Sequence, residues 1–215
     1  MDKLRILVAH DKQAITRSIE QVLGTYGFAV EPMNDGDEVA EALQEQHFDG
    51  LVIDAGLPGT PVHELCELAK AGDDPVPAVI TIAAVFRRKS YRRRPSSLYG
   101  ADDVVEVHRV ATELPAKLWR LFSGKGLDAA AKAEAEMALW SLRNEPSRGP
   151  ERLAGLMVAG LILGRADEVA DVDGPEELRQ ILGDDLSRVS TYVAGIMGAP
   201  EHERAVWASF DALAG

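Results

Sequence analysis

Two short segments carry side chains that can bind a cation or accept a phosphoryl group. His10 and Asp11 follow the apolar run 4–9, and Asp54 ends the apolar run 50–54. Short apolar runs of this kind are typical of buried parallel strands. Because the carboxyl ends of parallel strands meet at one edge of a sheet, we expect these three side chains to lie close together there. Carboxylate oxygens are ligands that Mg²⁺ prefers.

The rest of the first half predicts the elements that position this site. Apolar runs alternate with segments of helical periodicity, and right-handed crossovers between parallel strands then place helices on both faces of one sheet. We therefore predict an α/β fold with a five-stranded, parallel, doubly wound sheet. The predicted strands are 4–9, 28–30, 50–54, 77–84 and 103–107. The helices predicted after the second, third and fifth strands are 37–46, 61–71 and 113–122.

The second half predicts helices alone. Residues 123–126, Ser-Gly-Lys-Gly, are a predicted linker between a domain at 1–122 and a second, smaller all-α domain at 127–215 that serves output or dimerisation. Residues 153–164 are apolar all round, which predicts a central buried helix. The predicted helices are 128–142, 150–169, 175–197 and 201–213.

The strand pattern, the position of Asp54 and the sequence Gly-Ala-Asp-Asp at 100–103 resemble the receiver domain of response regulators, which has a CheY-like (flavodoxin-like) fold. The resemblance implies that Asp54 is the phosphoacceptor. It also implies a Mg²⁺ site formed by Asp11, Asp54 and the carbonyl of Gly56. The expected partner is a histidine kinase that supplies the phosphoryl group.

Three positions depart from the receiver pattern. His10 occupies the first acidic position, and imidazole is a poor ligand for Mg²⁺. Ala83 replaces the hydroxyl residue, and Val107 replaces the lysine that would hold the phosphoryl oxygens. His108 is the nearest substitute, although in a strand it points opposite to Val107. These changes predict weakened Mg²⁺ binding and a degenerate receiver, with a working phosphoacceptor or a merely capping Asp54 as alternatives.

A cationic segment lies between the last two predicted strands. Six of the eight residues 87–94 are Arg or Lys. Arginine and tyrosine are frequent anchors of protein interfaces, so we predict a docking surface, with a solvated loop as the alternative. The RxxxR spacing within it is also found in cyclic-dinucleotide modules, but the companion motif is missing. The predicted partner-binding residues are Arg87, Arg88, Tyr91, Arg92, Arg93, Arg94 and Tyr99.

Composition limits the function classes. The net charge of −12 disfavours binding to nucleic acid. One cysteine in 215 residues is typical of the cytoplasm, and the longest apolar stretch is too short for a membrane span. We therefore predict a cytoplasmic, non-enzymatic signalling protein that acts through protein contacts, including a homodimer. The alternative from another class is a flavodoxin-like cofactor-binding protein, although the loop 10–13 lacks a phosphate cradle.

Overall fold

A computed structural model describes residues 3–83, 99–124, 149–172, 174–198 and 202–215. The predicted helix 128–142, part of the predicted linker and the segment 84–98 lie outside the described residues.

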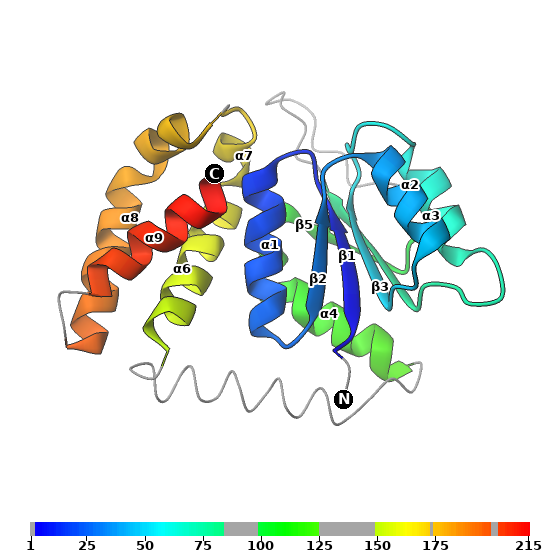
Figure 1. Cartoon of the computed structure of the whole chain (residues 1–215), viewed down its shortest axis with the longest axis horizontal. Coiled ribbons are helices and arrows are strands. Elements are labelled where there is room, and N and C mark those ends of the chain that lie inside the picture. The colour runs from blue at the N-terminus through cyan, green and yellow to red at the C-terminus, as the bar shows by residue number, and fades with distance from the viewer. Residues whose placement is uncertain (1–2, 84–98, 125–148, 173, 199–201) are drawn as a thin grey trace.

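The centre of the first half is a parallel sheet with strand order β2-β1-β3-β4-β5 (Figure 1). This arrangement confirms the predicted fold class. Strand β3 is buried at every residue, as its uninterrupted apolar sequence predicts for a central strand. The strands are β1 (Arg5–Ala9), β2 (Ala29–Met33), β3 (Gly50–Asp54), β4 (Ala78–Ala83) and β5 (Asp103–Glu106).

Helices cover both faces of the sheet, because each crossover connects two parallel strands. Helices α2 (Gly36–Glu45) and α3 (Val62–Lys70) enclose one apolar core with the side chains of Leu51 and Ile53. Helices α1 (Gln13–Thr25) and α4 (Val110–Gly124) cover the opposite face (Figure 1).

The end of the last strand differs from the sequence prediction. Strand β5 ends at Glu106, one residue early, and the short 3₁₀ helix η1 (Val107–Arg109) leads directly into α4. Helix α4 therefore begins at Val110 instead of Glu113. His108 therefore lies in η1 and not in a strand, and Nε2 of its exposed side chain lies 3.2 Å from the Glu106 carboxylate, while Val107 is buried.

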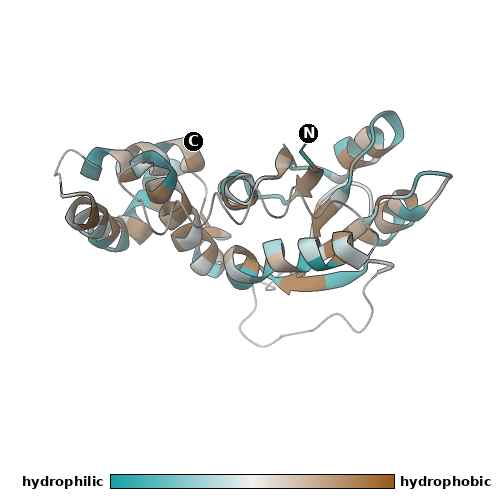
Figure 2. Ribbon diagram, turned by 90° about the horizontal axis from the view of Figure 1, so that it is seen from below, coloured by the Kyte–Doolittle hydropathy of each residue, from teal (hydrophilic) through white to brown (hydrophobic). Residues whose placement is uncertain are grey.

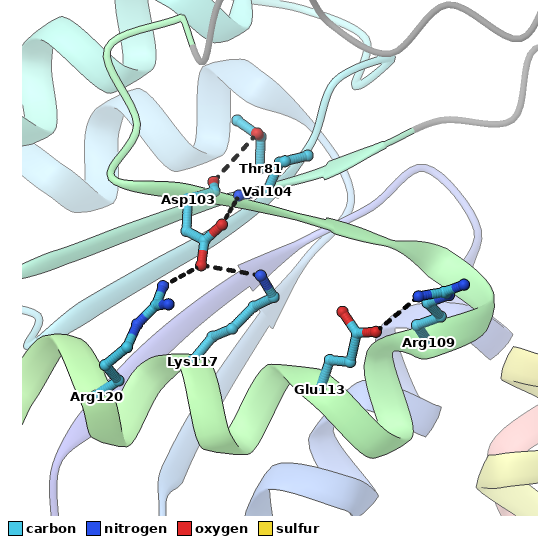
Figure 3. A network of polar contacts seen from close by, with 7 residues as sticks. All are labelled: Thr81, Asp103, Val104, Arg109, Glu113, Lys117 and Arg120. Atoms are coloured by element: carbon cyan, nitrogen blue, oxygen red, sulfur yellow. Dashed lines mark hydrogen bonds and ion pairs between the residues drawn. The ribbon is translucent and has the colours of Figure 1, made fainter.

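One acidic residue fixes α4 against the sheet (Figure 3). The side chain of Asp103 accepts hydrogen bonds from Nζ of Lys117 at 2.9 Å and from the amide of Val104 at 2.7 Å, and it also pairs with Arg120. Burial alone would raise the pKa of Asp103, but these hydrogen bonds and the two cations together lower it. Sequence spacing does not reveal this network, because its members meet only across the fold.

The described C-terminal residues are helical, as predicted. Their helices are α6 (Pro150–Gly164), α7 (Ala166–Val169), α8 (Pro175–Met197) and α9 (Glu203–Ala214). Helix α6 lies between α1 and the pair formed by α8 and α9 (Figure 1). Both flanks of α6 are thus covered, which accounts for its nearly uniform apolar sequence.

The C-terminal helices pack directly onto the first half of the chain and are not held apart from it. One continuous core of buried side chains runs from Ile19 of α1 through Val158 and Ile162 of α6 to Phe210 of α9. Hydrophobic residues, brown in Figure 2, accordingly recur through both halves of the molecule. The domain bounds 1–122 and 127–215 stay a prediction. None of the helices in the described parts of the chain has the length and apolarity to cross a membrane.

Candidate functional site

The three chemically capable residues meet at the carboxyl edge of the sheet, as the sequence predicted. Strands β1 and β3 are direct neighbours, with Ala9 paired to Ile53, so His10 follows β1 beside Asp54. His10, Asp11 and Asp54 each offer a ligand atom, and these atoms all lie within 4.8 Å of one another. The sheet register therefore brings one imidazole and two carboxylates together in a small cluster.

Asp54 is the most deeply buried carboxylate of the cluster. The residue is 3% exposed, and its Oδ1 lacks a hydrogen-bond partner among the described residues. Burial raises the pKa of Asp54, and the negative charge of Asp11 raises it further. The charge of His10 and the amides of Gly56 and Ala55 act in the opposite direction. An oxygen in this state is well suited to a cation or to a covalent modification.

His10 is held rigidly in place by its backbone. Its amide donates to the carbonyl of Met33 at 3.2 Å, and its carbonyl accepts from Nδ2 of Asn34 at 2.6 Å and from the Thr16 hydroxyl at 3.1 Å. Asn34 also donates to the Thr16 hydroxyl at 3.0 Å. Sequence reasoning missed Asn34 and Thr16. Thr16 could have been found from the sequence, because it is a polar residue on the buried face of α1.

The imidazole of His10 is 92% shielded and has two neighbours at the same nitrogen. The amide of Lys12 donates to Nδ1 at 3.1 Å, and Oδ1 of Asp11 lies 3.0 Å from Nδ1. The first contact requires a lone pair on Nδ1, whereas an ion pair with Asp11 requires a proton there. A cation bound by both Nδ1 of His10 and the Asp11 carboxylate would also make this short distance between Nδ1 and Oδ1 favourable.

The loop after Asp54 is clamped to the start of α2. The amide of Gly36 donates to the carbonyl of Pro58 at 2.8 Å, and the hydroxyl of Thr60 donates to Oδ1 of Asp37 at 2.6 Å. Gly59 has a φ of +83°, which favours glycine. The loop brings the amide of Gly56 to the Asp54 carboxylate, and use of the Gly56 carbonyl as a metal ligand stays a prediction.

The two positions expected to contact a phosphoryl group are apolar. Ala83 ends β4, and Val107 is 5% exposed at the start of η1. Ile82 pairs with Asp54 and so faces the Asp54 side of the sheet, whereas Ala83 and Thr81 face the other side. Ile82 supplies no hydroxyl, and Thr81 does not compensate from the opposite side. Its hydroxyl lies 3.5 Å from the carbonyl of Asp103 instead (Figure 3).

One residue of the predicted partner surface is described, and the C-terminal unit contacts the edge of the site. Tyr99 is 41% exposed, whereas the six other predicted partner-binding residues lie outside the described part of the chain. The C-terminal unit reaches the site edge: Nζ of Lys12 lies 3.5 Å from the carbonyl of Val172.

Comparison with known proteins identifies the first half. The response regulator receiver domain family matches residues 6–106. These residues form a receiver domain. The same stretch contains all five strands of the sheet and the cluster around Asp54, so the site lies within the receiver domain.

A longer stretch of the chain is also similar to curated response regulators. The response regulator MprA of Mycobacterium leprae is 30% identical over 151 residues, which cover 68% of this chain and 64% of that protein. MprA of Mycobacterium ulcerans is 28% identical over 158 residues, covering 70% and 66%. The match thus spans slightly less than two thirds of the length of these relatives.

Solved receiver domains resemble the receiver part of the chain. The receiver domain of the Francisella response regulator 1452 is 20% identical with a TM-score of 0.49, and covers 57% of this chain and 99% of its own. The receiver domain of the sensor histidine kinase PA1611 from Pseudomonas aeruginosa, described with a magnesium ion in its active site cleft, gives the same values.

The donor set does not fit Mg²⁺ well. The unpartnered Oδ1 of Asp54 is suited to a cation, but one of the three groups that meet there is an imidazole. Mg²⁺ favours an all-oxygen, near-octahedral shell and is poorly bound by nitrogen.

Proposed function

We propose that the chain is a response regulator of bacterial two-component or phosphorelay signalling whose receiver domain is degenerate. In this proposal it passes its state to protein partners without enzymatic turnover. The observation that carries the proposal is the apolar character of the residues at the ends of β4 and β5, namely Ile82 and Ala83 in β4 and the buried Val107 after β5. A missing cation at a charged phosphoryl group weakens such a site by several kcal/mol, on the order of 2–4.

A specific observation favours the alternative, a working phosphoacceptor. Oδ1 of Asp54 is buried without a partner among the described residues, and a rigid loop holds the neighbouring Gly56 amide against the carboxylate. A phosphoryl group on Asp54 would itself be anionic, so this alternative requires a divalent cation at the cluster to offset its charge. The histidine kinase remains the proposed phosphodonor in this alternative.

The experiment compares four proteins by two-dimensional amide NMR during addition of beryllium fluoride and Mg²⁺. For a degenerate receiver, the wild type and Asp54→Asn give unchanged spectra. The variant that combines Ala83→Thr, Val107→Lys and His10→Asp supplies the hydroxyl, the cation and the acidic group that the receiver pattern has at these positions, and it responds, while the same variant carrying Asp54→Asn does not. Circular dichroism confirms that each variant is folded. A wild-type response around Asp54 that Asp54→Asn abolishes would establish the working phosphoacceptor instead.

The proposed partner surface is the cationic segment together with Tyr99. Opposite charge favours an acidic partner surface, and the exposed Tyr99 adds an aromatic anchor. A homodimer through the helical unit and the absence of nucleic-acid binding stay part of the proposal. Replacement of Arg87, Arg88, Arg92, Arg93 and Arg94 by Ser tests it: capture of the kinase or of a second copy is lost if this surface docks the partner, and is retained otherwise.

A further inference from the structure

We propose that His10, Asp11 and Asp54 form a binding site for a divalent transition-metal cation of the Zn²⁺ type, in preference to Mg²⁺. This inference goes beyond the proposed function, because it holds whether or not Asp54 accepts a phosphoryl group. Within the described residues it is the one place where three metal-ligating side chains converge.

The distances suit shared coordination. Nδ1 of His10 and Oδ1 of Asp11 are 3.0 Å apart, and the ligand atoms of all three residues lie within 4.8 Å of one another. Two ligands at the tetrahedral angle on a cation with bonds of about 2.1 Å are about 3.4 Å apart. The closest pair is near this value, and the more widely separated ligand atoms must move together by about 1 Å to surround one ion.

The Asp54 carboxylate supplies an independent indication of a ligand. Oδ1 is buried, unpartnered among the described residues and part of the converging cluster. A buried polar atom without a partner is costly, and such atoms in native structures mark a place for an ion or water that completes the site. A dication bound to Oδ1 would also relieve the repulsion between Asp54 and Asp11.

The choice of cation follows from His10. Imidazole binds Zn²⁺ and its transition-metal neighbours well and Mg²⁺ poorly. Nδ1 carries a lone pair in the neutral imidazole, to which the Lys12 amide donates, and a metal ion that binds this lone pair takes the place of that hydrogen bond. The contacts of the His10 backbone with Met33, Asn34 and Thr16 hold the residue in place before the ion arrives, which lowers the cost of binding.

A second histidine provides an internal control. Nδ1 of His47 lies 2.9 Å from Asp74, and its Nε2 lies 3.8 Å from Asp49, so His47 also has two carboxylate neighbours. However, the His47 side chain is half exposed, and no buried unpartnered oxygen of the described residues adjoins it. Zn²⁺ binding at His47 therefore tests whether Zn²⁺ binds non-specifically to exposed histidines that have carboxylate neighbours.

The test titrates the full chain, freed of metal with a chelator, with Zn²⁺ and separately with Mg²⁺ by calorimetry. The variants are His10→Asp, Asp54→Asn and the control His47→Asn. We expect His10→Asp to weaken Zn²⁺ binding at least about tenfold and to strengthen Mg²⁺ binding, reversing the preference. Asp54→Asn should weaken Zn²⁺ binding by a similar factor, and His47→Asn should leave it unchanged.

Imidazole ¹⁵N NMR of the wild type gives a readout that depends on no variant. Zn²⁺ should shift the His10 nitrogen resonances first, before those of His47. The inference is overturned if the Zn²⁺ shifts start at another histidine, if His10→Asp leaves the ratio of Zn²⁺ to Mg²⁺ affinity unchanged, or if neither cation binds at millimolar concentration. The beryllium fluoride experiment also needs Mg²⁺ at this cluster, so its variant carrying His10→Asp tests phosphorylation with an acidic group in place of the imidazole, whereas the calorimetry tests the cation preference without any phosphoryl mimic.

Discussion

A side-chain carbon added at Gly155 of α6 would lie 2.7 Å from Nε2 of Gln21 in α1. The end of the Gln21 side chain therefore occupies the space beside Gly155, where the helical unit meets the receiver domain. Gly160, on the same helix, has open space at the corresponding position.

This contact predicts different effects of the same substitution at two glycines of α6. Gly155→Leu should lower the free energy of unfolding by about 1–3 kcal/mol, because the new side chain overpacks the α1 interface. Gly160→Leu should be neutral or stabilising by up to about 1 kcal/mol through its higher helix propensity. Urea denaturation followed by circular dichroism measures both. Equal losses at the two positions would show that α6 does not rest on α1 through Gly155.

Asp54→Asn should stabilise the metal-free protein at neutral pH. Burial raises the folded-state pKa of Asp54, so wild-type stability falls as the pH rises from the unfolded value of about 3.9 to the higher folded value. Above that value the penalty is constant, and we expect Asp54→Asn to raise the free energy of unfolding by about 1–3 kcal/mol. The gain should vanish below about pH 3.

Urea titrations with a chelator at several pH values check this prediction. Asp49→Asn is the contrasting variant, because Oδ2 of Asp49 accepts the Arg5 amide at 2.7 Å and its loss should destabilise the protein. A destabilised Asp54→Asn at pH 7 would contradict the argument.

Asp103→Asn should loosen α4 from the sheet. The variant weakens the interactions of the carboxylate with Lys117 and Arg120 (Figure 3), and we expect a loss of about 1–2 kcal/mol. Because the folded pKa is lowered, this stabilisation is present above the unfolded pKa and is lost as the pH falls through the folded pKa. Thermal unfolding at neutral and acidic pH measures it.

The matched control is Glu113→Gln, which removes an exposed ion pair with Arg109 at 3.1 Å on the same helix. It should change the stability by less than about 0.5 kcal/mol. A comparable loss in both variants would mean that the Asp103 network is no stronger than a surface ion pair.

Gly36→Ala should displace the loop that follows Asp54. The added carbon would lie 2.7 Å from the Thr60 carbonyl and 2.8 Å from the Pro58 carbonyl, and backbone atoms yield less readily than side chains. We expect a loss of about 1–3 kcal/mol and amide NMR shifts across residues 55–61. Gly24→Ala, where α1 leaves open space, should instead stabilise the protein by about 0.5–1 kcal/mol. An unshifted loop in Gly36→Ala would contradict the clamp.

Local pattern alone was sufficient for much of the receiver fold. The apolar runs around Ile6, Val52 and Ile80 predicted buried parallel strands because their side chains face cores on both sides of the sheet. The same strand ends placed His10, Asp11 and Asp54 at one edge, and the structure brings their ligand atoms together. The start of α4 was less predictable, because its first turn continues a 3₁₀ turn that periodicity does not reveal.

Only the tertiary structure decided how the site and the two halves are built. Two features of the site depend on separations across the fold that sequence spacing does not encode. They are the contact of Asn34 and Thr16 with the His10 carbonyl, and the lack of a partner for Asp54 Oδ1 in the parts of the chain that the structure describes. The sequence predicted that residues 153–164 form a buried helix but not which surface covers it. Burial requires only an apolar partner, and α1, α8 and α9 together provide it through shape and close approach at Gly155.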